Sequence, residues 1–515
     1  MLRFCCQTVS RPDQGGIIPE QEQSKNTQRS VSTEAFVTCA PDVDQTVPEP
    51  AAKRLVWRGS GISEGEAIDY DARAAHLEVR SDNGTLLGRM FSLSYVADVE
   101  GDRPVTFCYN GGPGCASVPI NFGGIGPRRV ETDGTNHLGH DNAVVDNPAT
   151  LLRQSDLVFL DALGTGSSMV ADGANTNQIF GIDGDADAFC RAILTWLEEN
   201  GRWSSPVYLF GESYGTVRNA VLMRLLGERG VHVTGVVMLS AIFDWVQTLP
   251  GSDLYYLGMM PTYAATAQFF GVRGQGRDVD EWFDEAMAFD EEVLAPALLL
   301  GDRLGREREA EVAHGLSGFI GLPEDLLMRH HLRVELDDFR RNLLLDRGKV
   351  TGRLDMRFAS DAPATVQRSS DWFAAEDAAD DAVDAAWTAA FRSFLHELGY
   401  RAPARYLSNN YPAVGAKWNW EHEVCGTGDK VSAPNVAYDI ATALRRSPKT
   451  RVAILGGRYD AATTWWNVVH DISCQFLSPE LRANVEFYRY GCGHMAYVDV
   501  PTLETMAHDM EEFYR

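Results

Sequence analysis

The feature that most constrains the fold is the pentapeptide Gly-Glu-Ser-Tyr-Gly at residues 211–215, together with its flanks. Residues 207–210 before it are a short apolar run of the kind that forms buried strands. Residues 216–228 after it carry apolar side chains at helical spacing. The alternative interpretation is an ordinary glycine-bounded turn. Strand, turn and helix in this order favour a nucleophile elbow, which presents the hydroxyl of Ser213 at the carboxyl end of a sheet.

Two later segments supply the groups that a serine nucleophile needs. A serine hydroxyl is a weak nucleophile until a base takes its proton and a third group orients that base. His494 lies on a glycine-rich loop after the apolar run 485–490, and Asp460 follows a second predicted strand at 452–455. Alone, these residues would be a surface histidine and a turn aspartate. The chain order Ser213, Asp460, His494 is the order found in α/β-hydrolases, and this agreement favours a triad.

A third segment is the loop Asn-Gly-Gly-Pro-Gly-Cys at residues 110–115, which follows a β-branched and aromatic run at 105–109. Taken alone, it would be an ordinary Gly/Pro turn. Glycines allow a backbone to approach a ligand without an intervening side chain. A loop of this kind after an early strand is suited to direct backbone N–H groups at a developing oxyanion.

Together these motifs resemble the serine carboxypeptidases of peptidase family S10. The matching segments are residues 110–115, 161–168, 211–215, 459–460 and 493–495. The resemblance runs in patches from about residue 80 to the end, and residues 202–206 and 459–463 look most like the bacterial branch. It implies an α/β-hydrolase fold, with a mostly parallel central sheet flanked by helices and a helical cap insertion.

The resemblance also implies a role for individual residues of the triad and the oxyanion hole. Ser213 would be the nucleophile, His494 the general base and then the general acid, and Asp460 the carboxylate that orients the histidine. The backbone N–H groups of Gly112 and Tyr214 would form the oxyanion hole. We expect neither a cofactor nor a metal.

Recognition of a free C-terminal carboxylate would fall, by the same resemblance, to Asn110, the backbone of Gly111 and Glu212. An ionised glutamate beside the nucleophile would repel a carboxylate, whereas a protonated one can donate a hydrogen bond to it. We expect burial and the amide of Asn110 to keep Glu212 protonated in mildly acid solution. The expected partners are therefore peptides with a free C-terminal carboxylate.

The chain departs from the family pattern near the expected substrate pocket. Cys108 and Ser167 stand where aromatic residues are usual, and Thr464 replaces a proline after Asp460. Tyr109 is aromatic but should point to the opposite face of its strand from Cys108. Side-chain preference is therefore not transferred from the family.

Composition and hydrophobic patterning predict three kinds of segment in the 515 residues. Residues 1–50 are rich in Gln, Ser, Thr and Pro and are predicted to be disordered. Residues 51–244 and 441–515 are predicted to form the catalytic domain. Strand signals fade over 245–440, which we interpret as a helical cap over the active site.

The formal net charge of −26 disfavours nucleic-acid partners and anionic membranes, and no run is long and apolar enough to span a membrane. The amino terminus has no apolar signal-peptide core, which predicts a cytoplasmic protein, or an exported one if translation starts elsewhere. Nine cysteines without metal-ligand spacing suit free thiols. Family members often hold a disulfide at the position of Cys115, but a bridge to Cys425 is disfavoured on compartment grounds.

The sequence thus predicts a serine-type carboxypeptidase that releases C-terminal residues through an acyl-enzyme. One alternative is a serine esterase or acyltransferase on the same fold. The other is a non-catalytic binding protein on a hydrolase fold. The sequence makes no prediction of oligomeric state.

Overall fold

The computed structural model describes residues 47–99, 101–138, 143–362, 377–402 and 406–515. The segment predicted to be disordered, residues 1–50, lies outside the described residues except for 47–50, which form no helix or strand.

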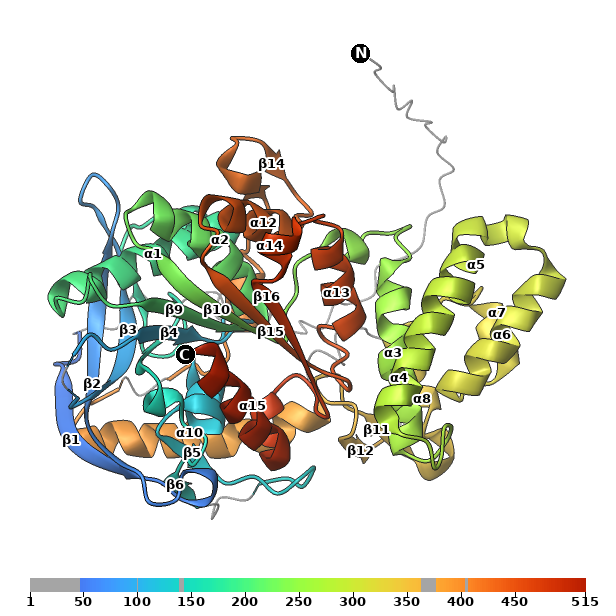
Figure 1. Cartoon of the computed structure of the whole chain (residues 1–515), viewed down its shortest axis with the longest axis horizontal. Coiled ribbons are helices and arrows are strands. Elements are labelled where there is room, and N and C mark those ends of the chain that lie inside the picture. Colours follow the sequence, from blue (N-terminus) through green and yellow to red (C-terminus); the bar gives the residue numbers. More distant parts are fainter. Residues whose placement is uncertain (1–46, 100, 139–142, 363–376, 403–405) are drawn as a thin grey trace, which may run out of the picture. The chain divides into compact units, whose positions relative to one another are not determined.

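A 10-stranded sheet runs through the described chain in the order β1-β2-β3-β7-β4-β9-β10-β15-β16, with β8 paired to β3 (Figure 1). The parallel part comprises β7 (Asp156–Leu160), β4 (Val105–Tyr109), β9 (Val207–Glu212), β10 (Val233–Leu239), β15 (Arg451–Gly457) and β16 (Val485–Tyr490). The antiparallel part comprises β1 (Ala51–Arg58), β2 (Ala67–Arg80), β3 (Leu86–Ala97) and β8 (Met169–Val170). The predicted, mostly parallel sheet is confirmed.

In the described part of the chain, three two-stranded sheets lie outside the central one. They pair β5 (Arg128–Val130) with β6 (Val144–Asp146), β11 (Lys349–Thr351) with β12 (Ala359–Asp361), and β13 (His422–Glu423) with β14 (Lys430–Val431).

Helices alternate with the parallel strands or follow them in long insertions. The helices before residue 300 are α1 (Ile182–Glu199), α2 (Tyr214–Glu228), α3 (Leu254–Phe269), α4 (Val279–Phe289) and α5 (Ala295–Leu300). The next are α6 (Arg306–Ile320), α7 (Glu324–Arg329), α8 (Leu336–Asn342), α10 (Ala378–Leu398) and α11 (Tyr411–Gly415). The last are α12 (Ala437–Arg446), α13 (Trp465–Ser473), α14 (Pro479–Arg482) and α15 (Val500–Phe513).

Side chains alternate along each strand and so point to both faces of the sheet, and helices bury both faces. In β9, Tyr208 and Phe210 join the apolar cluster that contains residues of α10 and α15. Val207 and Leu209 join the opposite cluster, with residues of α1, α2 and α12. The central strands are therefore apolar on both sides, which explains why their sequences read as continuous apolar runs.

The segment predicted as a single cap, 245–440, differs from the prediction in its packing. Residues of α3 to α8 form a third apolar cluster, which also takes in Ala461 and Trp466. Helix α10 instead packs in the sheet cluster, where Phe394 contacts Tyr95 and Phe122. The sequence predicted a helical insertion, but the acidic, alanine-rich pattern of α10 gave no sign of its buried side. The sequence therefore did not predict that α10 packs apart from α3 to α8. The proposed domain boundaries themselves stay a prediction.

Candidate active site

Ser213 lies in the sharp turn between β9 and α2, at φ 59° and ψ −128°. Its backbone N–H donates to the carbonyl of Leu239 at 2.9 Å, which fixes the turn against β10. A Cβ atom on Gly211 would lie 2.4 Å from the carbonyl oxygen of Gly215. The turn therefore needs a small residue at this position, and it holds the serine in a strained conformation that nucleophile elbows use.

The structure brings His494 and Asp460 together at the carboxyl ends of β16 and β15. Nδ1 of His494 lies 2.8 Å from Oδ2 of Asp460, and both residues are buried. Oδ1 of Asp460 accepts the backbone N–H groups of Ala462 and Thr463 at 2.8 and 3.0 Å. Within the described chain, no hydrogen bond joins the hydroxyl of Ser213 to His494; such bonds are often long before substrate binds.

Thr463 is a part of this arrangement that the sequence did not indicate. Its hydroxyl donates to Oδ2 of Asp460 at 2.7 Å and lies 3.2 Å from Nδ1 of His494. The hydroxyl oxygen can thus share the Nδ1 proton with the carboxylate. This contact favours the tautomer in which Nε2 of His494 is free to accept a proton.

The loop that carries His494 is held by a distant segment of the insertion. The backbone N–H of His494 donates to the carbonyl of Leu354 at 2.6 Å, and that of Gly493 donates to Oδ2 of Asp355 at 3.0 Å. Arg357 pairs with Asp355 at 2.7 Å and donates to the carbonyl of Gly491, also at 2.7 Å. Residues 354–357 therefore position the histidine loop, across a sequence separation that no local pattern reveals.

Two opposing effects act on the pKa of His494. Burial lowers this pKa, whereas the charge of Asp460, the hydrogen bond to it and the charge of Glu212 raise it. The net result is a pKa raised above the ordinary histidine value of 6.5. A neutral, proton-accepting His494 is therefore lost as the pH falls through this raised pKa.

The glycine-rich loop lies against the elbow. A Cβ atom on Gly111 would lie 2.4 Å from the backbone nitrogen of Tyr214, so only glycine allows this approach. Gly112 has φ +103°, in the region that glycine adopts freely. In the described part of the chain, neither the N–H of Gly112 nor that of Tyr214 donates to another protein group. Both donors are thus available to a ligand.

Glu212 lies beside the nucleophile and only 2% of its surface is exposed. The hydroxyl of Tyr497 donates to its Oε2 at 2.8 Å. Burial raises the pKa of Glu212 to about 7, although the charge of His494 and the hydrogen bonds from Tyr497 and Asn110 act in the lowering direction. Burial thus acts as predicted, whereas Asn110 acts against the prediction, because an N–H donor stabilises the ionised form.

Asn110 is held from both sides of the loop. Its Oδ1 accepts the backbone N–H of Ile120 at 3.0 Å, and its carbonyl accepts from the guanidinium of Arg218 at 3.0 Å. Arg218 is buried, pairs with Asp185 at 2.7 Å and lies 3.9 Å from the ring centroid of Phe189. Arg218 supports the predicted carboxylate-binding loop, a role that no sequence pattern indicated.

The residues that depart from the family pattern lie where the strand alternation places them. Cys108 and Tyr109 belong to the two opposite apolar clusters, as expected from their adjacent positions in β4.

Cys115 and Cys425 are both free cysteines in the structure. Over the described residues, no group of three or more His, Cys, Asp or Glu side chains could hold a metal ion. Over the same residues, no helix is long and apolar enough to cross a membrane.

The site combines the elbow at Ser213, the Asp460–His494 pair and the N–H groups of Gly112 and Tyr214. This arrangement, on a mostly parallel α/β sheet, is the one that serine hydrolases use.

Comparisons with known proteins agree with this class. Residues 84–228 match the family model for serine carboxypeptidases, Peptidase_S10. Serine carboxypeptidase-like 50 of Arabidopsis thaliana is 29% identical over 171 residues, which are 31% of this chain and 36% of the relative. Pheromone-processing carboxypeptidase kex1 of Talaromyces marneffei is 32% identical over 170 residues, or 31% of this chain and 24% of the relative. The matched segments thus span about a third or less of these relatives' length.

A crystal structure of Kex1(Δ)p, a prohormone-processing carboxypeptidase from Saccharomyces cerevisiae, covers 86% of this chain and 91% of its own with a TM-score of 0.52 at 14% identity. This likeness confirms the predicted α/β-hydrolase fold. Residues 84–228 and the aligned stretches of the relatives are thus similar to serine carboxypeptidases over part of the chain. The two relatives above come from a plant and a fungus, so the expected bacterial branch gains no support from them.

Proposed function

We propose that this chain is a serine-type carboxypeptidase that removes C-terminal residues from peptides through an acyl-enzyme. The observation that carries the proposal is the buried carboxyl of Glu212, which has a pKa raised by burial to about 7 and lies next to Ser213. A protonated carboxyl at this position can donate a hydrogen bond to the carboxylate of a peptide substrate. An ester substrate without a carboxylate cannot accept this hydrogen bond in the same way.

In the proposed reaction, neutral His494 takes the proton of Ser213 as the serine oxygen attacks the carbonyl carbon of the last peptide bond. The negative charge that develops on the carbonyl oxygen is stabilised by the N–H groups of Gly112 and Tyr214. Asp460 orients the histidine and stabilises the imidazolium that forms. The C–N bond breaks as His494 gives its proton to the leaving amine.

Water then completes the cycle. His494 takes a proton from a water molecule as the water oxygen attacks the acyl carbon. It then gives this proton to the oxygen of Ser213 as the ester C–O bond breaks, which releases the shortened peptide and restores the hydroxyl. The released amino acid carries the carboxylate that Asn110, the backbone of Gly111 and Glu212 are proposed to bind. Loss of this small product clears the side of the site on which the next water enters.

The proposal implies two opposing pH requirements. Glu212 must be protonated to donate, so binding weakens as the pH rises through its pKa of about 7. His494 must be neutral, so turnover falls as the pH drops through its raised pKa. Since each group shifts the pKa of the other, the profile reports the pair of groups and has its maximum between these limits.

The proposal is tested by mass spectrometry of a peptide mixture incubated with the protein. We expect successive loss of single residues from the carboxyl end and no loss from the same peptides with an amidated carboxyl terminus. Cleavage of both sets alike, or cleavage of simple esters alone, would contradict the proposal and favour the esterase or acyltransferase alternative.

A further inference from the structure

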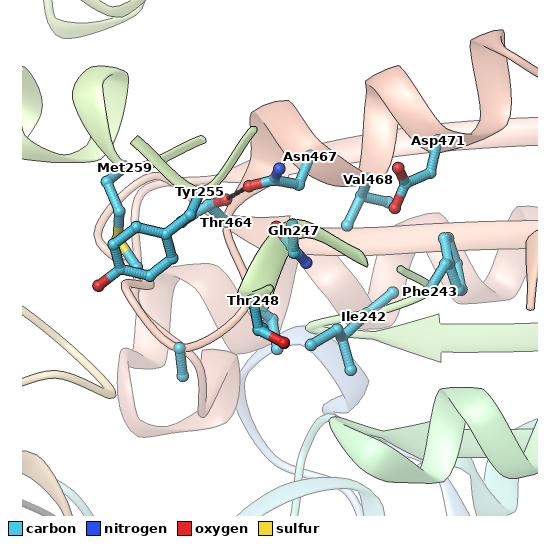
Figure 2. Close-up of a pocket in the computed structure, with 13 residues that line it drawn as sticks. Ile242, Phe243, Gln247, Thr248, Tyr255, Met259, Thr464, Asn467, Val468 and Asp471 are labelled. Carbon is cyan, nitrogen blue, oxygen red and sulfur yellow. Dashed lines mark hydrogen bonds between the residues drawn. The ribbon is translucent and has the colours of Figure 1, made fainter. Parts of the chain in front are cut away.

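A pocket lies between the loop after β10, the start of α3 and helix α13 (Figure 2). Thr463, whose hydroxyl contacts both members of that pair, lines it. Ile242 also lines it, and the Ile242 carbonyl accepts from the hydroxyl of Thr216 in the first turn of α2. The pocket therefore adjoins the groups proposed to carry the reaction.

The pocket contains a carboxyl oxygen without a partner. Asp471 is 2% exposed, and its Oδ2 has no hydrogen-bond partner in the described chain. Nδ1 of His470 lies 3.5 Å from the other oxygen, Oδ1, so this histidine leaves Oδ2 without a partner. A buried carboxylate oxygen without a partner is costly, and a bound cation can supply that partner.

A second buried carboxyl adds to the negative charge at this end of the pocket. Asp244 is 5% exposed, and its charge raises the pKa of Asp471. Asp244 accepts the backbone N–H of Val246 at 2.8 Å, which leaves its charge in place. Among the described residues, no lysine or arginine forms an ion pair with either aspartate. His470 is the single basic group that acts on them there.

The rest of the wall has apolar side chains at slightly more than half of its positions, with polar ones such as Gln247 and Asn467 among them. Figure 2 shows Tyr255 and Met259 at one end of the pocket and Asp471, with Val468 and Phe243, at the other. A hydrocarbon stem can pack along such a wall while a charged end group reaches the carboxylate. Lysine and arginine side chains have this combination of apolar stem and cationic head.

The order of the strands indicates which peptide residue faces the pocket. Asn110 and Gly111 follow β4, Ser213 follows β9, and the pocket residues follow β10 and β15. Ser213 thus lies between the proposed carboxylate-binding loop and the pocket. The residue that leaves with the carboxylate lies on the β4 side, so the residue whose carbonyl is attacked faces the pocket.

We propose that this pocket binds a lysine or arginine side chain of the penultimate peptide residue, and that Asp471 is the specificity-determining carboxylate, with Asp244 reinforcing its charge. This inference rests on the proposed function for the identity of the penultimate residue. Burial raises the pKa of Asp471 to about 6, so the carboxyl is ionised close to neutral pH and a bound cation stabilises this form.

The first test compares blocked dipeptide acids that differ only in their penultimate residue, lysine or norleucine, close to neutral pH. Norleucine has the stem without the charge. We expect kcat/KM to favour lysine by about 10- to 100-fold, the range for a hydrogen bond to a buried charge. Asp471→Asn keeps the shape and should remove most of this preference while it leaves the norleucine substrate within about threefold of wild type.

The matched control is Asp302→Asn, at an exposed aspartate away from the pocket, which should leave both substrates unchanged. Asp244→Asn should reduce the preference less than Asp471→Asn does. Lysine placed at the C-terminal position instead should not respond to Asp471→Asn. Equal rates for lysine and norleucine, or a lysine preference that survives in Asp471→Asn, would overturn the inference.

A second test measures the pocket without turnover, so that its failure is distinct from failure of the proposed function. The Ser213→Ala variant is titrated by calorimetry with the same lysine and norleucine peptides, with and without Asp471→Asn. Tighter binding of the lysine peptide that depends on Asp471 supports the pocket even if no peptide is cleaved. Equal affinities overturn it even if carboxypeptidase activity is found.

Discussion

The hydroxyl of Tyr497 donates a hydrogen bond of 2.8 Å to the carboxyl of Glu212, and both side chains are buried next to the proposed nucleophile. This donor stabilises the ionised form of Glu212 and so lowers its pKa from the higher value that burial alone would give. Tyr497 therefore adjusts the pH range in which Glu212 can bind a carboxylate.

The first prediction follows from this contact. Tyr497→Phe keeps the ring but removes the donor, so the pKa of Glu212 should rise. Since the protonated form of Glu212 is the active one, the alkaline limb of kcat/KM against pH for a peptide acid should move to higher pH. An unchanged or lowered alkaline limit would show that Glu212 does not set it. Because the charge of Glu212 helps to raise the pKa of His494, the acid limb should move by a smaller amount, to lower pH.

The second prediction concerns the close approach of Gly111 to the elbow. In Gly111→Ala, the new Cβ atom would lie 2.4 Å from the backbone nitrogen of Tyr214, so the loop must shift. A displacement of about 1 Å at a reacting centre can cost about 10²-fold in rate, and we expect a loss of that size in kcat. Gly227→Ala, in α2 with nothing within 4 Å of its new Cβ, is the control and should be neutral or stabilising. Full activity in Gly111→Ala would show that this loop does not contribute to the oxyanion hole.

The third prediction tests Thr463 as a positioning residue. Thr463→Val removes the hydroxyl that contacts Asp460 and His494, and loss of one such hydrogen bond should lower kcat by about tenfold with little change in KM. Thr463→Ser restores the hydroxyl and should recover most of the rate. By comparison, Asp460→Asn should cost about 10³- to 10⁴-fold because it favours the wrong tautomer of the histidine. A rate loss in Thr463→Val that Thr463→Ser fails to recover would indicate a packing role alone.

The fourth prediction concerns the nucleophile. Ser213→Ala should fold and lose several orders of magnitude in hydrolysis, as when other serine nucleophiles are removed. A fluorophosphonate probe should label the wild type at Ser213 and not label the variant. Ser473→Ala, at an exposed serine, is the matched control and should be labelled like the wild type. Labelling at another serine would reassign the nucleophile.

Much of the fold was predictable because the central strands are short apolar runs bounded by turns. The runs at 207–210, 452–455 and 485–490 each lie within an observed strand. Loop position then indicated the proposed site residues, because the carboxyl ends of neighbouring parallel strands share one edge of the sheet. Ser213, Asp460 and His494 all follow such ends.

The supporting contacts were not predictable because they join segments that are far apart in the chain. Asp355 reaches Gly493 across 138 residues, and Tyr497 reaches Glu212 across 285. Neither contact leaves a periodic or compositional signal in a single sequence. The sequence did not predict where α10 packs for a related reason. Its alanines and aspartates resemble those of a solvated helix, whereas Trp387, Phe391 and Phe394 are buried in the apolar cluster on one face of the sheet. Tertiary context, which local pattern does not contain, decided these features.

The central claim is that the site recognises a free C-terminal carboxylate through protonated Glu212. The most direct measurement is kcat/KM against pH for a blocked dipeptide acid and its amide, in the wild type and in Glu212→Gln. The account predicts a strong preference for the acid that declines as the pH rises through the pKa of Glu212, about 7, and that persists to higher pH in Glu212→Gln, where the donor stays neutral. Equal rates for acid and amide with the same pH profile would contradict it.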